Sequence, residues 1–467
     1  MGKLKQKAFW IATGDIIGRG FSFVTSIYLA RTLGAEYYGL ITVAISILGY
    51  ATWCSDLGLI NIGTRETAKK PEKRIFRVIE IFRAKIFLGV TVLILSFLIF
   101  AFVDLPKENK LVIVGYLLSL VPYMFLLEWL YSGKQEFGKI TLSKGLNGLV
   151  YFLLVIFFVQ SSDDVTLVPL LYIMGVSTAA LVLGTFAFRG SPFKLPSRGI
   201  QLYQDLLKTS SYLGIGQFFT QIVTLLPPIL IGFIISLQDA GIYGAAFKIV
   251  IIAMMLDRVF VQLFLPNLSS VWSIDKHTAS KTVSTVFRFT AAGGTLIALF
   301  TALASEQIIG FLYGADYAES AAILKILSVM IAVTFINSLF SFGLIATNRD
   351  REYFAATGIG GIISGFLIVI FTAYGNILLT AIAVSLAEII IAAFTYFRFK
   401  KVIPNNYLRP ILICYSSGIM LFLILSFIPL KPIVNAFVGA ILFLMIILKF
   451  NIVNKDHLDW AREKITQ

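Results

Sequence analysis

Cysteine and histidine are nearly absent from this sequence. Its 467 residues include only Cys54, Cys414, His277 and His457. Both cysteines lie in or beside apolar runs, which excludes a disulfide framework and a cysteine-based metal cluster. Both histidines lie in hydrophilic connecting segments, so neither is placed to exchange protons inside an apolar run. We therefore predict no metal site.

Charge is also scarce, and this scarcity decides the class of protein. Charged residues make up 14% of the chain and hydrophobic residues 58%, and the runs 209–238, 353–387 and 411–430 contain no charge at all. A helix needs about 20 mainly apolar residues to cross a bilayer. These runs are continuous rather than alternating, which favours helices over the strands of a membrane barrel.

Fourteen stretches are long and apolar enough to span a membrane. We predict an all-α polytopic membrane protein with spans at 8–30, 38–62, 83–103, 111–131, 142–160, 166–188, 209–235, 243–268, 284–304, 321–346, 353–373, 376–398, 409–428 and 432–448. The longest connections run to about twenty residues, which is too short for an independent domain. A membrane glycosyltransferase or polymerase would need a sizeable loop for its active site. We therefore expect no enzyme and no catalytic residue.

The basic residues are distributed unevenly between the two sides of these spans. The formal net charge is +14, which in a soluble protein would suggest nucleic acid. With the N-terminus in the cytoplasm, 31 of the 39 lysines and arginines fall in inward segments and five in outward ones. Cytoplasmic loops of membrane proteins carry this excess. The sequence therefore predicts that both termini are cytoplasmic and that no nucleic acid is bound.

One segment approaches a nucleotide-binding motif. Residues 133–139 have the glycine and lysine spacing of a P-loop, but Ile140 occupies the Ser/Thr position. The motif requires a preceding strand, whereas this segment joins two predicted membrane helices. We interpret it as a basic turn at the membrane surface and do not expect ATP hydrolysis.

An internal repeat links the two halves of the chain. The pattern A-x-x-Y-G occurs at 35–39, after the first span, and at 240–244, after the seventh. Such short matches also arise by chance, but these occupy corresponding places. Six spans separate the copies, so the repeats would be parallel, related by an axis along the membrane normal. We predict two pseudo-symmetric six-helix lobes, 1–205 and 206–402, followed by two further helices and a cytoplasmic tail over 403–467.

Polar stripes precede both copies of the repeat. Asp15, Arg19, Ser22 and Ser26 follow helical spacing along 8–30, and Gln217, Gln221 and Thr224 do so along 209–235. Two lobes facing each other would enclose a cavity lined by these stripes. Gln217 and Gln221 offer uncharged hydrogen bonds suited to sugar hydroxyls. Hydrogen bonding between helices explains them equally well.

The N-terminal sequence carries a family resemblance. Residues 28–39, Tyr-Leu-Ala-Arg-Thr-Leu-Gly-Ala-Glu-Tyr-Tyr-Gly, and 56–59, Asp-Leu-Gly-Leu, resemble the signature of bacterial polysaccharide transporters. The turn at 312–317 is similar to a recurrent feature of that family. These are the lipid-linked oligosaccharide (O-antigen type) flippases of the multidrug/oligosaccharidyl-lipid/polysaccharide exporter superfamily.

The resemblance implies a function in the bacterial cytoplasmic (inner) membrane. Polyprenyl-pyrophosphate-linked glycan would move from the inner to the outer leaflet by alternating access, for cell-surface polysaccharide biosynthesis. It also implies the lipid bilayer, a polysaccharide polymerase and glycosyltransferases as partners. An ion-coupled exporter of organic cations from the same superfamily would share the architecture and remains the alternative.

Charged residues within the spans are the candidate site. Each costs about 2.5–3.5 kcal/mol on insertion scales, so they usually face a cavity. A pyrophosphate stripped of water needs fixed cations, which favours Arg19 and Arg258, with Lys248 third. Arg19 lies one turn from Asp15, so an ion pair is as good a reading as a ligand role. Lys248 could instead snorkel to the outer surface.

Acidic residues oppose these cations. Asp15, Asp257 and Glu388 match Arg19, Lys248 and Arg258 in number, so charge alone does not separate a flippase of anionic lipids from a cation exporter. Asp257 and Arg258 are adjacent and point about 100° apart on a helix, so they do not pair directly. We expect no cofactor. If transport is coupled to H⁺ or Na⁺, Glu388 and Asp257 are the candidate sites.

Overall fold

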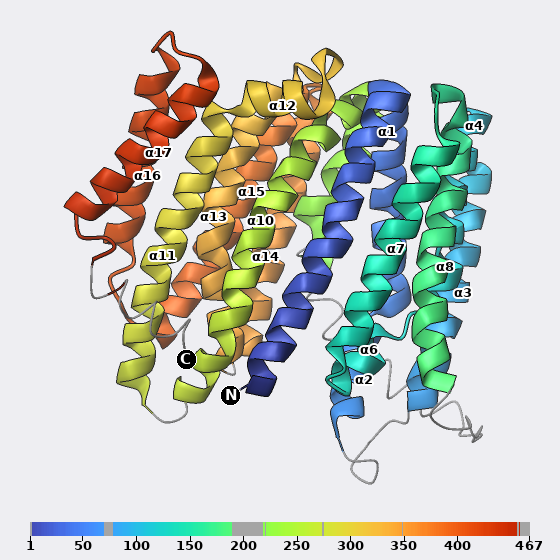
Figure 1. Cartoon of the computed structure of the whole chain (residues 1–467), viewed down its shortest axis with the longest axis horizontal. Coiled ribbons are helices and arrows are strands. Elements are labelled where there is room, and N and C mark those ends of the chain that lie inside the picture. The colour runs from blue at the N-terminus through green and yellow to red at the C-terminus, as the bar shows by residue number, and fades with distance from the viewer. Residues whose placement is uncertain are drawn as a thin grey trace. The chain divides into compact units, whose positions relative to one another are not determined.

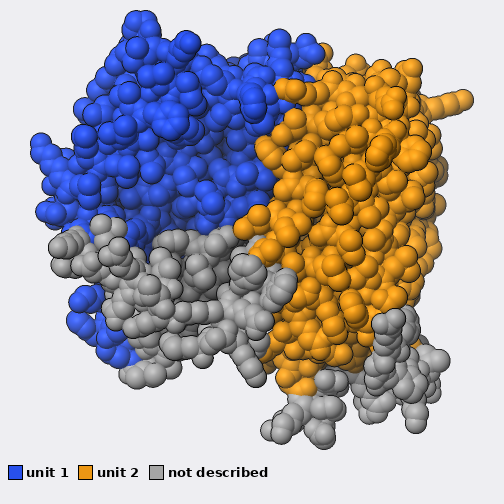
Figure 2. All heavy atoms as spheres, in the orientation of Figure 1, with its two compact units in different colours: residues 1, 242–467 blue, residues 2–241 orange. Residues whose placement is uncertain are grey.

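All regular elements in the described part of the chain are helices. The computed structural model describes residues 2–69, 78–188, 218–219, 221–272, 275–347, 349–454 and 457. Within these ranges there is no strand, which confirms the predicted all-α class (Figure 1). The chain divides into two compact units, residues 2–241 and residues 242–467 (Figure 2). The pseudo-symmetric lobes expected over 1–205 and 206–402 stay a prediction.

The unit formed by residues 2–241 is built around long apolar helices. Helix α1 packs against α7, and α7 packs against α8 (Figure 1). The helices are α1 (Gly2–Asp56), α2 (Leu59–Ala68), α3 (Val78–Phe102), α4 (Lys107–Leu118), α5 (Leu120–Met124), α6 (Glu128–Gly133), α7 (Phe137–Phe158) and α8 (Val168–Phe188), with a 3₁₀ turn at Ser162–Leu167 and a π-helical turn at Ile231–Ile235.

The unit formed by residues 242–467 has α13 near its centre, in contact with α11 and α15. Helices α16 and α17 pack on each other and on α11 (Figure 1). The helices are α10 (Leu237–Trp272, which begins in the other unit), α11 (Lys276–Leu303), α12 (Ser305–Tyr313), α13 (Ser320–Ala346), α14 (Asp350–Ala373), α15 (Ile377–Val402), α16 (Leu408–Ser426) and α17 (Pro432–Lys449), with a 3₁₀ turn at Ala315–Tyr317.

Each predicted span overlaps a helix in the described part of the chain. Twelve helices in the described ranges are long and apolar enough to cross a membrane. One of them, Ile16–Asp56, continues through a break at Gly34 and so contains the predicted spans 8–30 and 38–62. A shorter apolar helix, Gln221–Ile235, lies in the predicted span 209–235. Each of the fourteen predicted spans is therefore at least partly helical.

The break at Gly34 needs a glycine. Its backbone angles, φ 78° and ψ 173°, lie in a region that is essentially restricted to glycine because other residues carry a Cβ. The first copy of the A-x-x-Y-G repeat follows this break directly. The signature around Gly34 therefore marks the change of direction between two membrane helices.

The two copies of the repeat also approach each other closely. A Cβ built on Gly39 would fall on the carbonyl oxygen of Leu237, and one built on Gly241 would fall on that of Ala35. All four residues lie in the unit 2–241. Only glycine lets two backbones meet at this distance. The resemblance between the two segments is thus accompanied by a direct contact between them.

Pro227 and Pro228 do not break their helix, contrary to the interruption that two adjacent prolines suggest. The helix continues from Gln221 to Leu230, and the departure from α-helical geometry comes afterwards, as the π-helical turn Ile231–Ile235. Proline removes one N–H donor and its ring crowds the carbonyl four residues earlier, but its φ is close to the helical value, so the chain can remain helical through both. The N–H of Ser236 donates to the Ile231 carbonyl at 3.0 Å and closes the π turn.

Candidate functional site

Arg19 lies half-buried in the apolar part of α1. Glycines of α1 bring it close to α7, since a Cβ on Gly14 would lie 2.8 Å from the Thr141 hydroxyl and one on Gly18 would lie 3.4 Å from the Lys144 Cβ. Arg19 follows Gly18 and points about 100° away around the helix, so its side chain does not point in the direction of the contact between Gly18 and Lys144. The side chain of Asp15 lies outside the described residues, and its pairing with Arg19 stays a prediction.

The other predicted cations and amides are only partly described. Lys248 is half-buried in α10. The Oε1 atom of Gln221 accepts a hydrogen bond from the Thr224 hydroxyl at 3.3 Å, so these two members of the polar stripe interact along their own helix. The side chain of Arg258 and all of Gln217 lie outside the described residues. That Arg19 and Lys248 share one cavity stays a prediction.

Glu388 forms the centre of a buried polar cluster between α13 and α15. Its side chain is 8% exposed. Its Oε1 atom accepts hydrogen bonds from the Thr334 hydroxyl at 3.0 Å and from the Asn337 amide at 3.2 Å. The Asn337 Oδ1 atom in turn accepts from the Thr395 hydroxyl at 2.7 Å. Two neutral hydrogen-bond donors, the Thr334 hydroxyl and the Asn337 amide, therefore hold the Glu388 carboxylate.

Asp257 of α10 is also buried, and it contacts the same face of α13 as Glu388 does. Its side chain is 3% exposed, and its Oδ1 atom accepts a hydrogen bond from the Ser338 hydroxyl at 2.8 Å. Helix α13 therefore contacts both buried acids, Asp257 of α10 through Ser338 and Glu388 of α15 through Thr334 and Asn337. The structure brings the two candidate ion-coupling residues to one helix.

The sequence contained a signal for this arrangement that was missed. Thr334, Asn337, Ser338 and Ser341 occur at i, i+3, i+4 and i+7 in an apolar span, which is one face of a helix. The same spacing had been recognised for Arg19 and Gln221, where a charge or a repeat drew attention to it. A stripe of small polar residues alone has the same signature as helix packing.

Carboxylate, amide and hydroxyl oxygens form the kind of site that hard cations prefer. In the described part of the chain, no group of three or more His, Cys, Asp or Glu residues could hold a metal ion. The cluster at Glu388 has one carboxylate and neutral oxygens, which is the donor set of a monovalent cation or a proton rather than of a structural metal.

A further buried charge is Lys85 of α3, which belongs to the basic residues counted on the inward side although it lies within the predicted span 83–103. Helix α3 begins at Val78, earlier than the expected 83, and the Lys85 side chain is 7% exposed. Its Nζ donates to the Leu126 carbonyl at 3.1 Å, and it experiences the charge of Asp56. Leu126 lies between α5 and α6, where a helix break leaves the carbonyl available.

Asp56, from the Asp-Leu-Gly-Leu signature, has a structural role in the turn between α1 and α2. Its carboxylate accepts the backbone N–H groups of Gly58 at 3.2 Å and Ile60 at 3.1 Å. The α2 helix begins at Leu59, so the carboxylate satisfies donors at a helix start and interacts favourably with its dipole. Gln135, in the P-loop-like segment, has a φ of 61° in a turn between α6 and α7, as expected for a connecting turn.

Comparison with known proteins places this architecture in a family. A family model described as "Polysaccharide biosynthesis protein" matches residues 4–272, which is more than half of the chain and includes the signature, the first repeat and Arg19. The chain belongs to this family. It is a multi-pass membrane protein, as the twelve membrane-length helices indicate. The chain is also similar to the "Putative O-antigen transporter" of Escherichia coli (strain K12), with 22% identity over 75% of this chain and 86% of that protein.

Solved structures share the fold of this family member. The "Lipid II flippase MurJ" in an inward closed conformation matches with a TM-score of 0.74 and 13% identity over 94% of this chain and 99% of that one. An inward-facing multidrug resistance MATE family transporter of the MOP superfamily matches with a TM-score of 0.63 and 12% identity over 84% and 98%. These likenesses establish the fold and leave the substrate open.

Proposed function

We propose that the chain is a flippase that moves polyprenyl-pyrophosphate-linked oligosaccharide from the inner to the outer leaflet of the bacterial cytoplasmic membrane. The observation that carries the proposal is the family match over residues 4–272. The similarity to an O-antigen transporter and a fold like that of a lipid II flippase support it. The protein would act as a transporter rather than an enzyme, without a cofactor, with both termini in the cytoplasm, alongside polysaccharide polymerase and glycosyltransferases.

The chemistry of the headgroup assigns a role to Arg19. A pyrophosphate that leaves water for a protein cavity loses its hydration, and charge-assisted hydrogen bonds are the strongest replacement. Guanidinium presents paired donors that match two phosphate oxygens, which lysine cannot reproduce. Arg19 is half-buried, in a helix that is long and apolar enough to cross a membrane and in the family-matched part of the chain. Arg258 or Lys248 would contribute from the second half.

Complementation of a cell that lacks its own flippase tests this role. If Arg19 is a ligand, Arg19→Gln and the double variant Asp15→Asn/Arg19→Gln should both lose surface polysaccharide while the protein still accumulates. Full rescue by the double variant would show that Arg19 only neutralises Asp15 and would contradict the ligand role. Arg65→Gln, at an exposed arginine in α2, is the matched control and should complement normally.

An ion-coupled multidrug exporter is the second candidate function. Buried Glu388 favours it, because a carboxylate held by neutral hydrogen-bond donors suits a transported cation, and MATE transporters share the fold. Glu388→Gln keeps the oxygen that accepts from Thr334 and Asn337, so folding should be preserved. If the chain is a cation exporter, this variant should abolish organic-cation efflux. A wild-type protein that exports no organic cation would exclude this candidate.

A further inference from the structure

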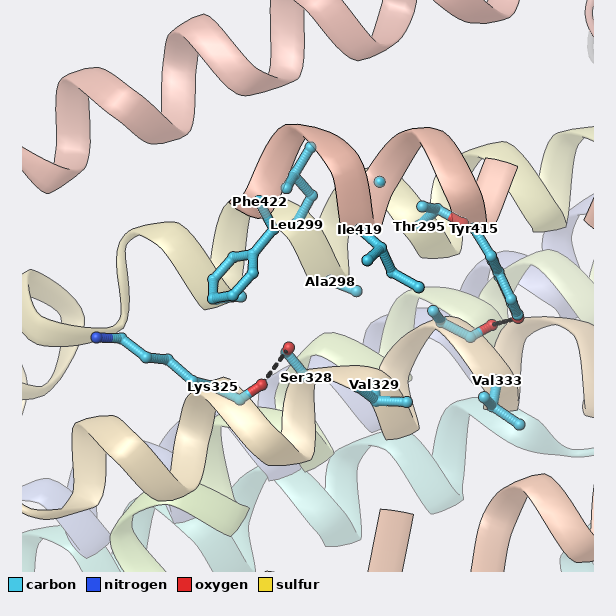
Figure 3. A pocket seen from close by; sticks show the side chains of 13 residues that line it. Thr295, Ala298, Leu299, Lys325, Ser328, Val329, Val333, Tyr415, Ile419 and Phe422 are labelled. Atoms are coloured by element: carbon cyan, nitrogen blue, oxygen red, sulfur yellow. Dashed lines mark hydrogen bonds between the residues drawn. The ribbon is translucent and has the colours of Figure 1, made fainter. Parts of the chain in front are cut away.

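A separate pocket lies between α11, α13 and α16 (Figure 3). Its volume is about 180 Å³. An apolar cavity of about 150 Å³ already holds a benzene-sized hydrocarbon. The walls are aliphatic and aromatic side chains, among them Ala298, Leu299, Val329, Val333, Ile419 and Phe422. The pocket contains none of the residues assigned to the transport pathway.

The hydroxyl groups in the pocket are already bonded to main-chain carbonyls. Thr295 donates to a carbonyl of its own helix at 2.8 Å, and Ser328 does so at 2.7 Å. Tyr415 donates across to the carbonyl of Ala332 at 2.9 Å, and the last two bonds are visible in Figure 3. A sugar would therefore find no hydroxyl donor without a partner here. These walls fit a hydrocarbon occupant.

The length of the pocket is shorter than one leaflet of a bilayer. It extends along each helix over eight or nine residues, that is seven or eight helical rises, from Thr295 to Ala302, from Val333 to Lys325 and from Tyr415 to Phe422. At 1.5 Å per residue this is about 10–12 Å. The hydrocarbon core of a bilayer is about 30 Å thick. Because Lys325 is on the predicted outward side, the pocket matches one acyl chain of the outer leaflet.

Lys325 lines the pocket at its predicted outer end and forms an ion pair with Glu306 of α12, which is outside the lining. The Lys325 Nζ lies 2.7 Å from the Glu306 Oε1, and both side chains remain accessible, at 37% and 58% exposure. An exposed pair of this kind is weak and can exchange partners readily. A zwitterionic headgroup complements both members, since its phosphate accepts from Lys325 and a primary ammonium donates to Glu306. A trimethylammonium group has no N–H to donate, and the glycerol headgroup of an anionic lipid offers Glu306 only neutral hydroxyl donors, which bind a carboxylate more weakly than an ammonium does.

We propose that this pocket is a binding site for an outer-leaflet phospholipid with a phosphoethanolamine headgroup. One acyl chain fills the space between α11, α13 and α16, and the headgroup bridges Lys325 and Glu306. The site is distinct from the proposed flippase pathway and does not depend on the identity of the transported substrate.

Native mass spectrometry of the purified full-length protein tests the site. The protein is mixed with equal amounts of phosphatidylethanolamine, phosphatidylcholine and phosphatidylglycerol that have identical acyl chains. The wild type should retain one phosphatidylethanolamine with a preference of about threefold over each of the others. Lys325→Gln should reduce this preference to about one while a lipid is still retained. Lys431→Gln, at an exposed lysine on the same predicted side, should leave the preference unchanged.

Filling the pocket separates chain binding from headgroup binding. Ala298→Phe should remove the retained lipid altogether, and Val329→Trp, at a more exposed wall, gives a second variant if Ala298→Phe fails to accumulate. Equal retention of the three lipids by the wild type would overturn the proposal, as would retention that neither filling variant reduces. Displacement of phosphatidylethanolamine by an equal amount of polyprenyl phosphate would identify the carrier's tail as the occupant and also refute it.

Discussion

Lys85 shows how one buried charge can stabilise the unit formed by residues 2–241. Its ammonium satisfies the Leu126 carbonyl and lies in the field of Asp56, which caps the turn after α1. The sequence placed this lysine at a membrane boundary, where lysines normally reach water. Its acceptor is exposed by a helix break some forty residues later, and no local pattern around Lys85 reveals that break.

Removing this charge should lower stability. In Lys85→Met the Leu126 carbonyl loses its donor and Asp56 loses a compensating charge, which should cost about 1–3 kcal/mol. The melting temperature of the purified protein should fall accordingly. Lys107→Met, at an exposed lysine that begins α4, should change stability by less than about 0.5 kcal/mol. A Lys85→Met protein as stable as the wild type would mean that the buried contact contributes nothing.

Among the elements, the two segments of the A-x-x-Y-G repeat depend most strictly on residue size. Gly39→Ala would place a methyl group on the Leu237 carbonyl oxygen, so the backbones must separate, at a cost of about 3 kcal/mol. Gly241→Ala should have a similar effect through the Ala35 carbonyl. Fluorescence-detected thermal unfolding measures the loss of stability in both variants. As a control, the methyl group of Gly20→Ala in α1 meets no atom within 4 Å, so this change should be tolerated. Equal losses of stability in all three variants would disprove the close approach of the two backbones.

The sequence predicted the membrane helices well because the bilayer imposes length and hydropathy on each of them separately. Within the predicted span 209–235 the structure describes Phe218, Phe219 and the residues from Gln221 to Ile235, and the helix there continues through Pro227 and Pro228. The functional clusters were less predictable. Glu388 was recognised because a charge in a span is conspicuous, whereas Thr334 and Asn337, which hold it, resemble ordinary packing residues until α13 and α15 are placed side by side.

At the scale of the whole molecule, the charge asymmetry predicts its orientation. Reporter fusions at Asp164 and Lys455 should read outside and inside respectively, because 31 basic residues lie on one predicted side and five on the other. An alkaline phosphatase fusion should be active at Asp164, and a green fluorescent protein fusion should be fluorescent at Lys455. The same location at both positions would contradict the fourteen-span topology and the orientation assigned to the lipid pocket.

Reconstituted transport tests the central claim most directly. Purified protein is placed in vesicles that contain a polyprenyl-pyrophosphate-linked oligosaccharide in both leaflets, with and without an imposed Na⁺ or H⁺ gradient. A membrane-impermeant reagent then measures the fraction of glycan that is accessible from outside. The flippase account predicts that wild-type protein makes nearly all of the glycan accessible and that Arg19→Gln does not. An accessible fraction equal to that of protein-free vesicles under every gradient, while the same vesicles transport an organic cation, would contradict the account.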